Sequence, residues 1–138
     1  MIQRISHTSI FVLDQDAAKK FYVEKLGFEV KNDLTMGSFR WLTVSPKGQA
    51  DVELILMPLS PSPKMDEASV ATLRELVKRG AFGGGVLQTD DCKRTYETLR
   101  AAGVEFLSPP TERPYGIEAL LKDDSGNWYS LTQRFGKV

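Results

Sequence analysis

ISHTSIFVLD, at residues 5–14, is a strand-like run that leads through a helical stretch to LGFEV at 26–30. The same plan returns in the second half of the chain, where GGGVLQTDD at 83–91 leads to AGVEF at 102–106. The chain therefore contains an internal repeat. A single copy cannot bury its own apolar face, so we expect the two copies to pair and the cleft between them to hold a ligand.

The opening run alternates as a half-buried strand does. Its odd-numbered residues from Ile5 to Phe11 share one predicted face, while Ile10 and Val12 share the other. Because of this alternation, the side chain of His7 is expected to point away from Ile10 and Val12. His7 is the only histidine of the protein. Asp14 or Asp16 is expected to cap the helix that follows, and Gly27 to end it.

The rest of the chain divides in the same way. Three strands are predicted at 28–31, 38–44 and 52–57, with turns at Asn32-Asp33 and Pro46-Lys47-Gly48. Prolines between residues 58 and 63 indicate a connector, and an amphipathic helix opens at Asp66-Glu67. The second copy predicts a strand at 84–89, a helix at 92–102 and strands at 104–107, 117–122 and 128–133, with a hairpin loop at 123–127.

These elements predict an α+β fold of one domain over residues 1–138. A first module of order βαβββ spans 1–58, a linker with a helix spans 59–82, and a second βαβββ module spans 83–138.

Composition narrows the function. The chain has 18 basic residues (Lys and Arg) and 18 acidic residues (Asp and Glu). This zero net charge does not indicate binding to the phosphates of a nucleic acid. The single Cys92 falls in a predicted helix and reads as a small apolar residue rather than a nucleophile. No apolar run is long enough for a membrane span and the amino end lacks the regions of a secretory signal, so we expect a cytoplasmic protein.

Several sequence motifs, taken in the order in which they occur along the chain, resemble those of the glyoxalase, bleomycin resistance and extradiol dioxygenase superfamily, also called vicinal oxygen chelate proteins. They are His7 with Asp14, Phe21-Tyr22 before Leu26-Gly27-Phe28, Val52-Glu53-Leu54, Asp90-Asp91 before Gly103-Val104, and Pro114-Tyr115-Gly116 ahead of Asp124-Ser125-Gly126-Asn127. The resemblance covers nearly the whole chain. It implies two βαβββ modules whose curved mixed sheet surrounds a shared cleft, often in a homodimer, with the modules paired within one chain or across two.

The resemblance also implies a divalent metal in catalytic members, held by one residue from the opening and closing strand of each module. The first module supplies His7 and Glu53, which suit zinc, iron, nickel or manganese. Counting from the motifs of the second module places Gly84 and Ser130 at the remaining two positions. Gly84 has no ligand atom, so the metal quartet is incomplete, although Gln88, Glu118 or Gln133 could substitute.

Other residues are candidates for contact with an organic ligand. Aromatic side chains give a cleft walls that suit a flat or amphipathic molecule, and Gly84 and Ser130 leave space there. Glu118 could bind a cationic or hydroxyl group. The full set of ligand-binding candidates is Phe39, Trp41, Gly84, Gln88, Tyr115, Glu118 and Ser130.

Two functions follow. The ligand count favours a protein that binds a small molecule without metal, similar to bleomycin resistance proteins. The alternative is a metal-dependent glyoxalase-like lyase or isomerase, or a dioxygenase, in which His7 and Glu53 are catalytic as ligand and base. His7 could equally serve only as a hydrogen-bonding group in the cleft.

Overall fold

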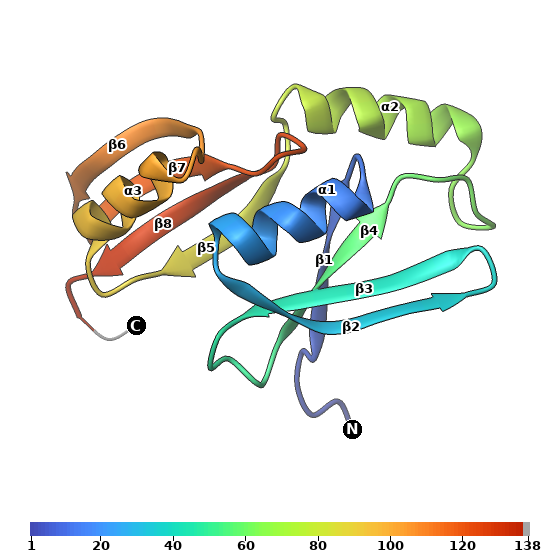
Figure 1. Ribbon diagram of the computed structural model, residues 1–138, viewed down its shortest axis with the longest axis horizontal. Coiled ribbons are helices and arrows are strands. Elements are labelled where there is room, and N and C mark those ends of the chain that lie inside the picture. The colour runs from blue at the N-terminus through green and yellow to red at the C-terminus, as the bar shows by residue number, and fades with distance from the viewer. Residues whose placement is uncertain (137–138) are drawn as a thin grey trace. The chain divides into compact units, whose positions relative to one another are not determined.

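The computed structural model describes residues 1–136, and the chain divides into two compact units, Met1–Val77 and Lys78–Val138. Each unit contains one four-stranded mixed sheet and helices (Figure 1). The strand orders are β1-β4-β3-β2 and β5-β8-β7-β6, so the second sheet repeats the topology of the first. The α+β fold with two βαβββ modules is confirmed.

The first sheet comprises β1 (His7–Val12), β2 (Phe28–Met36), β3 (Phe39–Pro46) and β4 (Glu53–Pro58). β1 and β4 pair in parallel, whereas β3 is antiparallel to both β2 and β4. Helix α1 (Gln15–Lys20) continues as a π-helical turn, η1 (Phe21–Lys25), and joins β1 to β2. Asp14 accepts a hydrogen bond from the backbone N–H of Ala17, which confirms it as the helix cap.

Alternation along the strands separates the two faces of this sheet. Ile10, Val12, Leu42, Val44 and Leu56 are buried on the face that α1 covers (Figure 1). Ala18, Phe21 and Tyr22 from α1 and η1 complete this core. His7 is exposed on the opposite face, so the predicted orientation of the opening strand is confirmed.

The predicted turn at Asn32-Asp33 is wrong. β2 continues through both residues to Met36, and the chain turns at Gly37, whose φ of 63° favours glycine. A register shift between Val30 and Asn32 marks a β-bulge. The bulge lets Asn32 and Asp33 remain in the strand, where both side chains make tertiary contacts.

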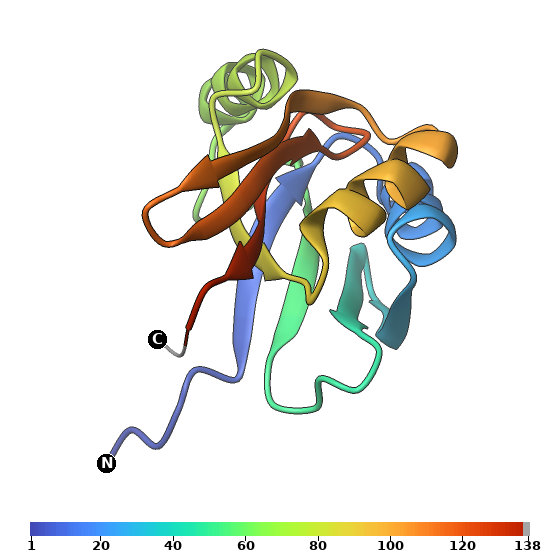
Figure 2. The ribbon, with the colours of Figure 1, turned by 90° about the vertical axis from the view of Figure 1, so that its left-hand side faces the viewer.

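The connector between the copies contains a 12-residue helix, α2 (Glu67–Lys78), which Figure 2 shows nearly end-on. Asp66 caps it by accepting a hydrogen bond from the N–H of Ser69 at 2.8 Å. All of α2 except Lys78 belongs to the first unit, so the boundary falls inside the predicted linker. Among residues 1–136, no helix has the length and apolarity needed to cross a membrane.

The second sheet comprises β5 (Gly83–Gln88), β6 (Phe106–Arg113), β7 (Gly116–Lys122) and β8 (Trp128–Arg134). Helix α3 (Cys92–Ala101) covers one of its faces (Figures 1 and 2). In the loop before β8, Asp123 accepts three backbone hydrogen bonds, from residues 125–127. Cys92 is fully buried, as expected of a small apolar residue, and burial raises the pKa of its thiol.

Candidate functional site

His7 and Glu53 lie side by side on the face of the first sheet opposite Ile10 and Val12. They occupy directly paired positions of the parallel strands β1 and β4, so both side chains project from the same face. His7 Nε2 lies 3.6 Å from Glu53 Oε1. The pair predicted from the sequence as a functional couple is therefore brought together by strand register alone.

Glu53 is held by two further side chains of the same sheet. Thr43 Oγ1 donates to Glu53 Oε1 at 2.6 Å, and Asn32 Nδ2 donates to the same oxygen at 3.0 Å. The Thr43 hydrogen bond lowers the pKa of Glu53 most, burial opposes it, and Asn32 together with the charges of His7 and Lys31 lowers the pKa further. Glu53 is thus an oriented carboxylate that favours its ionised form.

His7 sits between this carboxylate and an aromatic ring. Its Nδ1 lies 2.9 Å from Ser6 Oγ, and its ring centroid lies 5.5 Å from that of Trp41. About a third of the His7 side chain is exposed (34%). The imidazole can therefore hydrogen-bond to a bound molecule while Glu53 and Trp41 restrict its orientation.

We predict that replacing Thr43 by valine raises the pKa of Glu53, because the strongest hydrogen bond to the carboxylate is removed while side-chain volume is kept. An NMR titration of the side-chain carboxyl carbon of Glu53 measures the change. Ser45→Ala is the matched control, since Ser45 lies on the same strand but donates to the carbonyl of Val52. An unchanged Glu53 pKa in Thr43→Val would contradict this assignment.

Apolar side chains lie on the same face as the pair. The ladder places Trp41 opposite Leu34 and Phe39 opposite Met36, and the Phe39 and Trp41 rings lie 6.5 Å apart. Leu34 and Met36 are more than half exposed, at 55% and 57%. Phe39 and Trp41 therefore lie on the His7 face, which carries apolar side chains together with one polar pair, residue types that small-molecule sites combine. We call this face, with His7, Asn32, Phe39, Trp41, Thr43 and Glu53, the imidazole face.

The ladder between β5 and β8 of the second unit carries no such pair. Val86 pairs with Ser130 in the parallel ladder of β5 and β8, and Gly83 pairs with Trp128. In the first unit, Ser9 pairs with Ile55 and His7 with Glu53. The first rung of the second ladder therefore carries Gly83 and Trp128, where the first ladder carries His7 and Glu53.

A register shift between Gly83 and Gly85 marks a β-bulge at the glycines. A Cβ at residue 84 would lie 2.4 Å from two ring carbons of Tyr129, a buried residue on the face that α3 covers. Gly84 thus accommodates the core rather than a ligand. The incomplete metal quartet, inferred from Gly84 and Ser130, stays a prediction.

Glu118 organises a second polar group. Its Oε1 accepts from the Tyr115 hydroxyl at 2.8 Å and its Oε2 accepts from Ser130 Oγ at 2.6 Å, while Ser130 Oγ is also 2.6 Å from Thr132 Oγ1. Three of the predicted ligand-binding residues are therefore in contact. The hydrogen bond to Glu118 raises the pKa of Tyr115, because it favours the neutral phenol.

Gln88 and Gln133 stand apart from this polar group. Gln88 is exposed at the end of β5. Gln133 accepts a hydrogen bond from the backbone N–H of Cys92, so it serves the start of α3, and its suggested role as a replacement metal ligand is wrong. Asn32 and Thr43 are site residues that were not predicted from the sequence. Thr43 lies two residues after Trp41, so strand alternation places both side chains on the same face, and this pattern could have identified Thr43.

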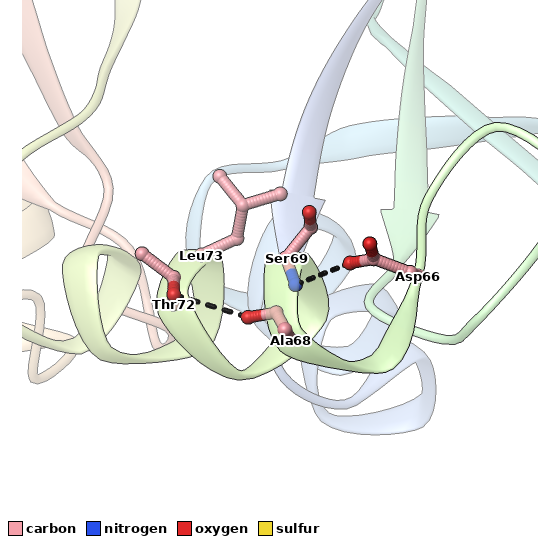
Figure 3. Close-up of a pocket in the computed structure, with 5 residues that line it drawn as sticks. All are labelled: Asp66, Ala68, Ser69, Thr72 and Leu73. Atoms are coloured by element: carbon pink, nitrogen blue, oxygen red, sulfur yellow. Dashed lines mark hydrogen bonds between the residues drawn. The ribbon is translucent and has the colours of Figure 1, made fainter.

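A hollow of about 500 Å³ lies at the start of α2 (Figure 3). Its polar groups are occupied by the helix itself: Asp66 caps the N–H of Ser69, and Thr72 donates to the carbonyl of Ala68. The lining residues stabilise the N-terminal turns of α2, and their contacts do not indicate a bound ligand. Its residues are Asp66, Ala68, Ser69, Thr72 and Leu73.

The donor set was tested against the divalent metal of catalytic family members. Within residues 1–136, no group of three or more His, Cys, Asp or Glu side chains could hold one ion. His7 and Glu53 supply two donors, and one Glu53 oxygen already accepts two hydrogen bonds. A catalytic site normally keeps about three protein ligands, so these residues do not fit that metal centre.

Comparison with known proteins places the chain in a family. The model of the Glyoxalase/Bleomycin resistance protein/Dioxygenase superfamily matches residues 4–131. The chain is 39% identical over 132 residues to the uncharacterized protein YurT of Bacillus subtilis, covering 95% of this chain and 99% of that protein.

Solved structures of similar proteins also match this chain. UcmS2 has 53% sequence identity and a TM-score of 0.92, with 96% of this chain and 99% of that chain covered. TnmS3, described as an antibiotic binding protein from Streptomyces sp. CB03234, has 33% identity and a TM-score of 0.76, with 96% and 97% covered. With the repeated module and the register of His7 and Glu53, these matches show that the chain belongs to the glyoxalase/bleomycin resistance protein/dioxygenase superfamily.

Proposed function

We propose that this protein binds a small aromatic organic molecule of the antibiotic type on the imidazole face and holds it without metal and without chemical change. The observation that carries the proposal is the state of Glu53. Its Oε1 is engaged by Thr43 and Asn32, and the same oxygen is the one nearest to His7. Such a carboxylate fixes the imidazole and serves poorly as a proton-transfer base or metal ligand.

The surroundings of the pair support a bound aromatic molecule. Trp41, Phe39 and the exposed Leu34 and Met36 offer apolar contact area, and His7 offers one oriented polar contact. Binding sites for small organic molecules combine these two elements: area supplies affinity, and a few polar groups fix orientation. The relative described as an antibiotic binding protein is consistent with this ligand class.

The test is isothermal titration of protein purified in EDTA with three probes: daunorubicin, which has a planar ring system, bleomycin, a basic glycopeptide, and ampicillin, which lacks fused aromatic rings. We expect a dissociation constant of about 10 μM or tighter for daunorubicin, unchanged by EDTA. Mass spectrometry should recover the bound compound intact. The proposal would be refuted if daunorubicin does not bind, or if it binds only after metal is added.

The alternative of a metal-dependent lyase, isomerase or dioxygenase makes the opposite prediction. Zinc, nickel, iron or manganese would then raise the melting temperature stoichiometrically, and His7→Ala would abolish that shift. The two-donor set on the imidazole face argues against this outcome. The homodimer and the cleft between modules, both implied by the family, stay predictions that size-exclusion chromatography and a ligand-bound crystal structure can test.

A further inference from the structure

A groove of about 350 Å³ lies within the second unit, where α3 runs beside the edge strand β6 (Figure 1). The Tyr96 ring of α3 meets the Phe106 ring of β6 edge-on, with their centroids 4.6 Å apart. Both rings line the groove, together with Val104, Leu107 and Pro109. A groove of this size with aromatic and aliphatic walls can receive a small organic molecule.

The strand that forms one wall of the groove is irregular. A register shift between Phe106 and Ser108 leaves Leu107 without a partner on β7, and the Leu107 side chain is more than half exposed (55%). A second shift coincides with the prolines at residues 109 and 110. Because bulges and prolines on an edge strand hinder pairing with a further strand, the groove suits a compact molecule better than an extended peptide.

Arg100 brings a positive charge to this apolar lining. It lies one helical turn after Tyr96, its Nη1 donates to the Tyr96 hydroxyl at 3.2 Å, and its Cζ lies 5.8 Å from the centroid of the Tyr96 ring. Within residues 1–136, Arg100 forms no ion pair with a carboxylate. The guanidinium is therefore oriented by Tyr96, and its charge is available to an anion.

Tyr96 and Arg100 together form a set of hydrogen-bond donors. A guanidinium has five N–H donors, and Tyr96 accepts only one of them. The Tyr96 hydroxyl accepts from Arg100, so its own O–H can donate to a third group. The other charged residue of the lining, Glu105, already pairs with Lys122 at 3.3 Å and has a side chain that is 67% exposed. The groove thus combines apolar walls with donors that match an anion.

We propose that this groove is a second binding site, which takes a small aromatic carboxylic acid. The carboxylate accepts hydrogen bonds from Arg100 and from the Tyr96 hydroxyl, and the aromatic body contacts Phe106 and Leu107. Arginine suits this role because its planar guanidinium can hold both oxygens of a carboxylate. The site lies entirely within the second unit and does not depend on the proposed function of the imidazole face.

The test compares naphthoate with naphthamide, an uncharged molecule that has the same ring system. In ¹H–¹⁵N NMR spectra of the full chain, we expect naphthoate to shift the backbone signals of residues 100–107, with a dissociation constant of about 1 mM or tighter. Naphthamide should bind at least about 5-fold more weakly, because it lacks the charge that Arg100 recognises. Raising the NaCl concentration should weaken naphthoate binding, since salt screens exposed charges.

Substitutions separate the contributions of charge, geometry and hydroxyl. We expect Arg100→Gln to weaken naphthoate binding by at least about 10-fold and Arg100→Lys by about 3-fold, since lysine keeps the charge but loses the planar fork. Tyr96→Phe keeps the ring and loses one donor, and it should cost about 3-fold in affinity. Arg94→Gln removes the same charge from α3 at a residue outside the groove lining and is the matched control, with no expected change.

Several results would overturn this inference: equal affinity for naphthoate and naphthamide, signal shifts that lie outside residues 100–107, or equal losses in Arg94→Gln and Arg100→Gln. A wild-type melting temperature of Arg100→Gln shows that its lost affinity is not lost folding. If naphthoate does not bind, the inference fails while the proposed function stands, because no residue of the imidazole face takes part in this site. Failure of daunorubicin binding has the reverse meaning.

Discussion

Replacing Asp33 by asparagine should lower the free energy of unfolding by about 2–3 kcal/mol at neutral pH. Asp33 lies on β2, where Arg40 Nε donates to its Oδ1 at 2.8 Å and Arg40 Nη2 to its Oδ2 at 3.0 Å. Lys19 of α1 donates to Oδ2 at 2.8 Å. Only 24% of the Asp33 side chain is exposed, so its loss removes the enclosed anion of Lys19 and leaves Arg40 with only the exposed Asp16.

The same contacts determine how stability depends on pH. The hydrogen bond from Arg40, followed by that from Lys19, holds the pKa of Asp33 far below its usual range. A lowered folded-state pKa contributes stability that is complete above the unfolded value, near 4, and is lost as pH falls toward the folded value. Wild-type stability should therefore fall more steeply than that of Asp33→Asn below about pH 4. Urea unfolding at pH 7 and at several acidic values measures both effects.

Asp16 provides a matched control. It also contacts Arg40, at 2.6 Å from Nη1, but its side chain is 86% exposed. Asp16→Asn should change the free energy of unfolding by less than about 1 kcal/mol, because exposed ion pairs are weakened by solvent. Equal effects of the two substitutions would contradict the importance of the enclosed Asp33 contacts.

The fold could be predicted because its determinants are local. Asp14 and Asp91 precede helices in both copies and each accepts an N-capping hydrogen bond, from Ala17 and Arg94. Alternation in β1 was enough to place His7 opposite Ile10 and Val12. Pairing His7 with Glu53 required the family resemblance as well, since strand register is a tertiary property.

The turn that was wrongly predicted lies where tertiary contacts override local signals. Asn32-Asp33 has the composition of a turn, yet tertiary contacts to Glu53 and Arg40 keep both residues in β2. The register shift between Gly83 and Gly85 is likewise a bulge that regular strand spacing does not predict. A one-residue slip reverses which face a side chain occupies, so small errors in register become large errors in a site.

The second large effect is expected at Trp41. Trp41→Ala should weaken binding of an aromatic antibiotic by about 30- to 150-fold, which corresponds to about 2–3 kcal/mol for the lost ring contact. The indole is half-buried on the imidazole face, against His7 and within 6.5 Å of the Phe39 centroid. Removing the indole also removes a restraint on the His7 ring. The ligand therefore loses the oriented polar contact with His7 as well as the apolar contact area of Trp41.

Trp41→Phe tests whether the aromatic surface is what matters. Phenylalanine keeps a ring beside His7, and we expect less than about 5-fold loss of affinity for daunorubicin by titration calorimetry. Leu34→Ala, at the ladder position opposite Trp41, removes an exposed apolar neighbour and should have an intermediate effect. Wild-type affinity in Trp41→Ala, with a normal melting temperature, would show that the ligand does not bind on the imidazole face. A ligand at this face places the molecule beside the one histidine of the chain, so the histidine ring signals should shift in wild type and in Trp41→Phe alike.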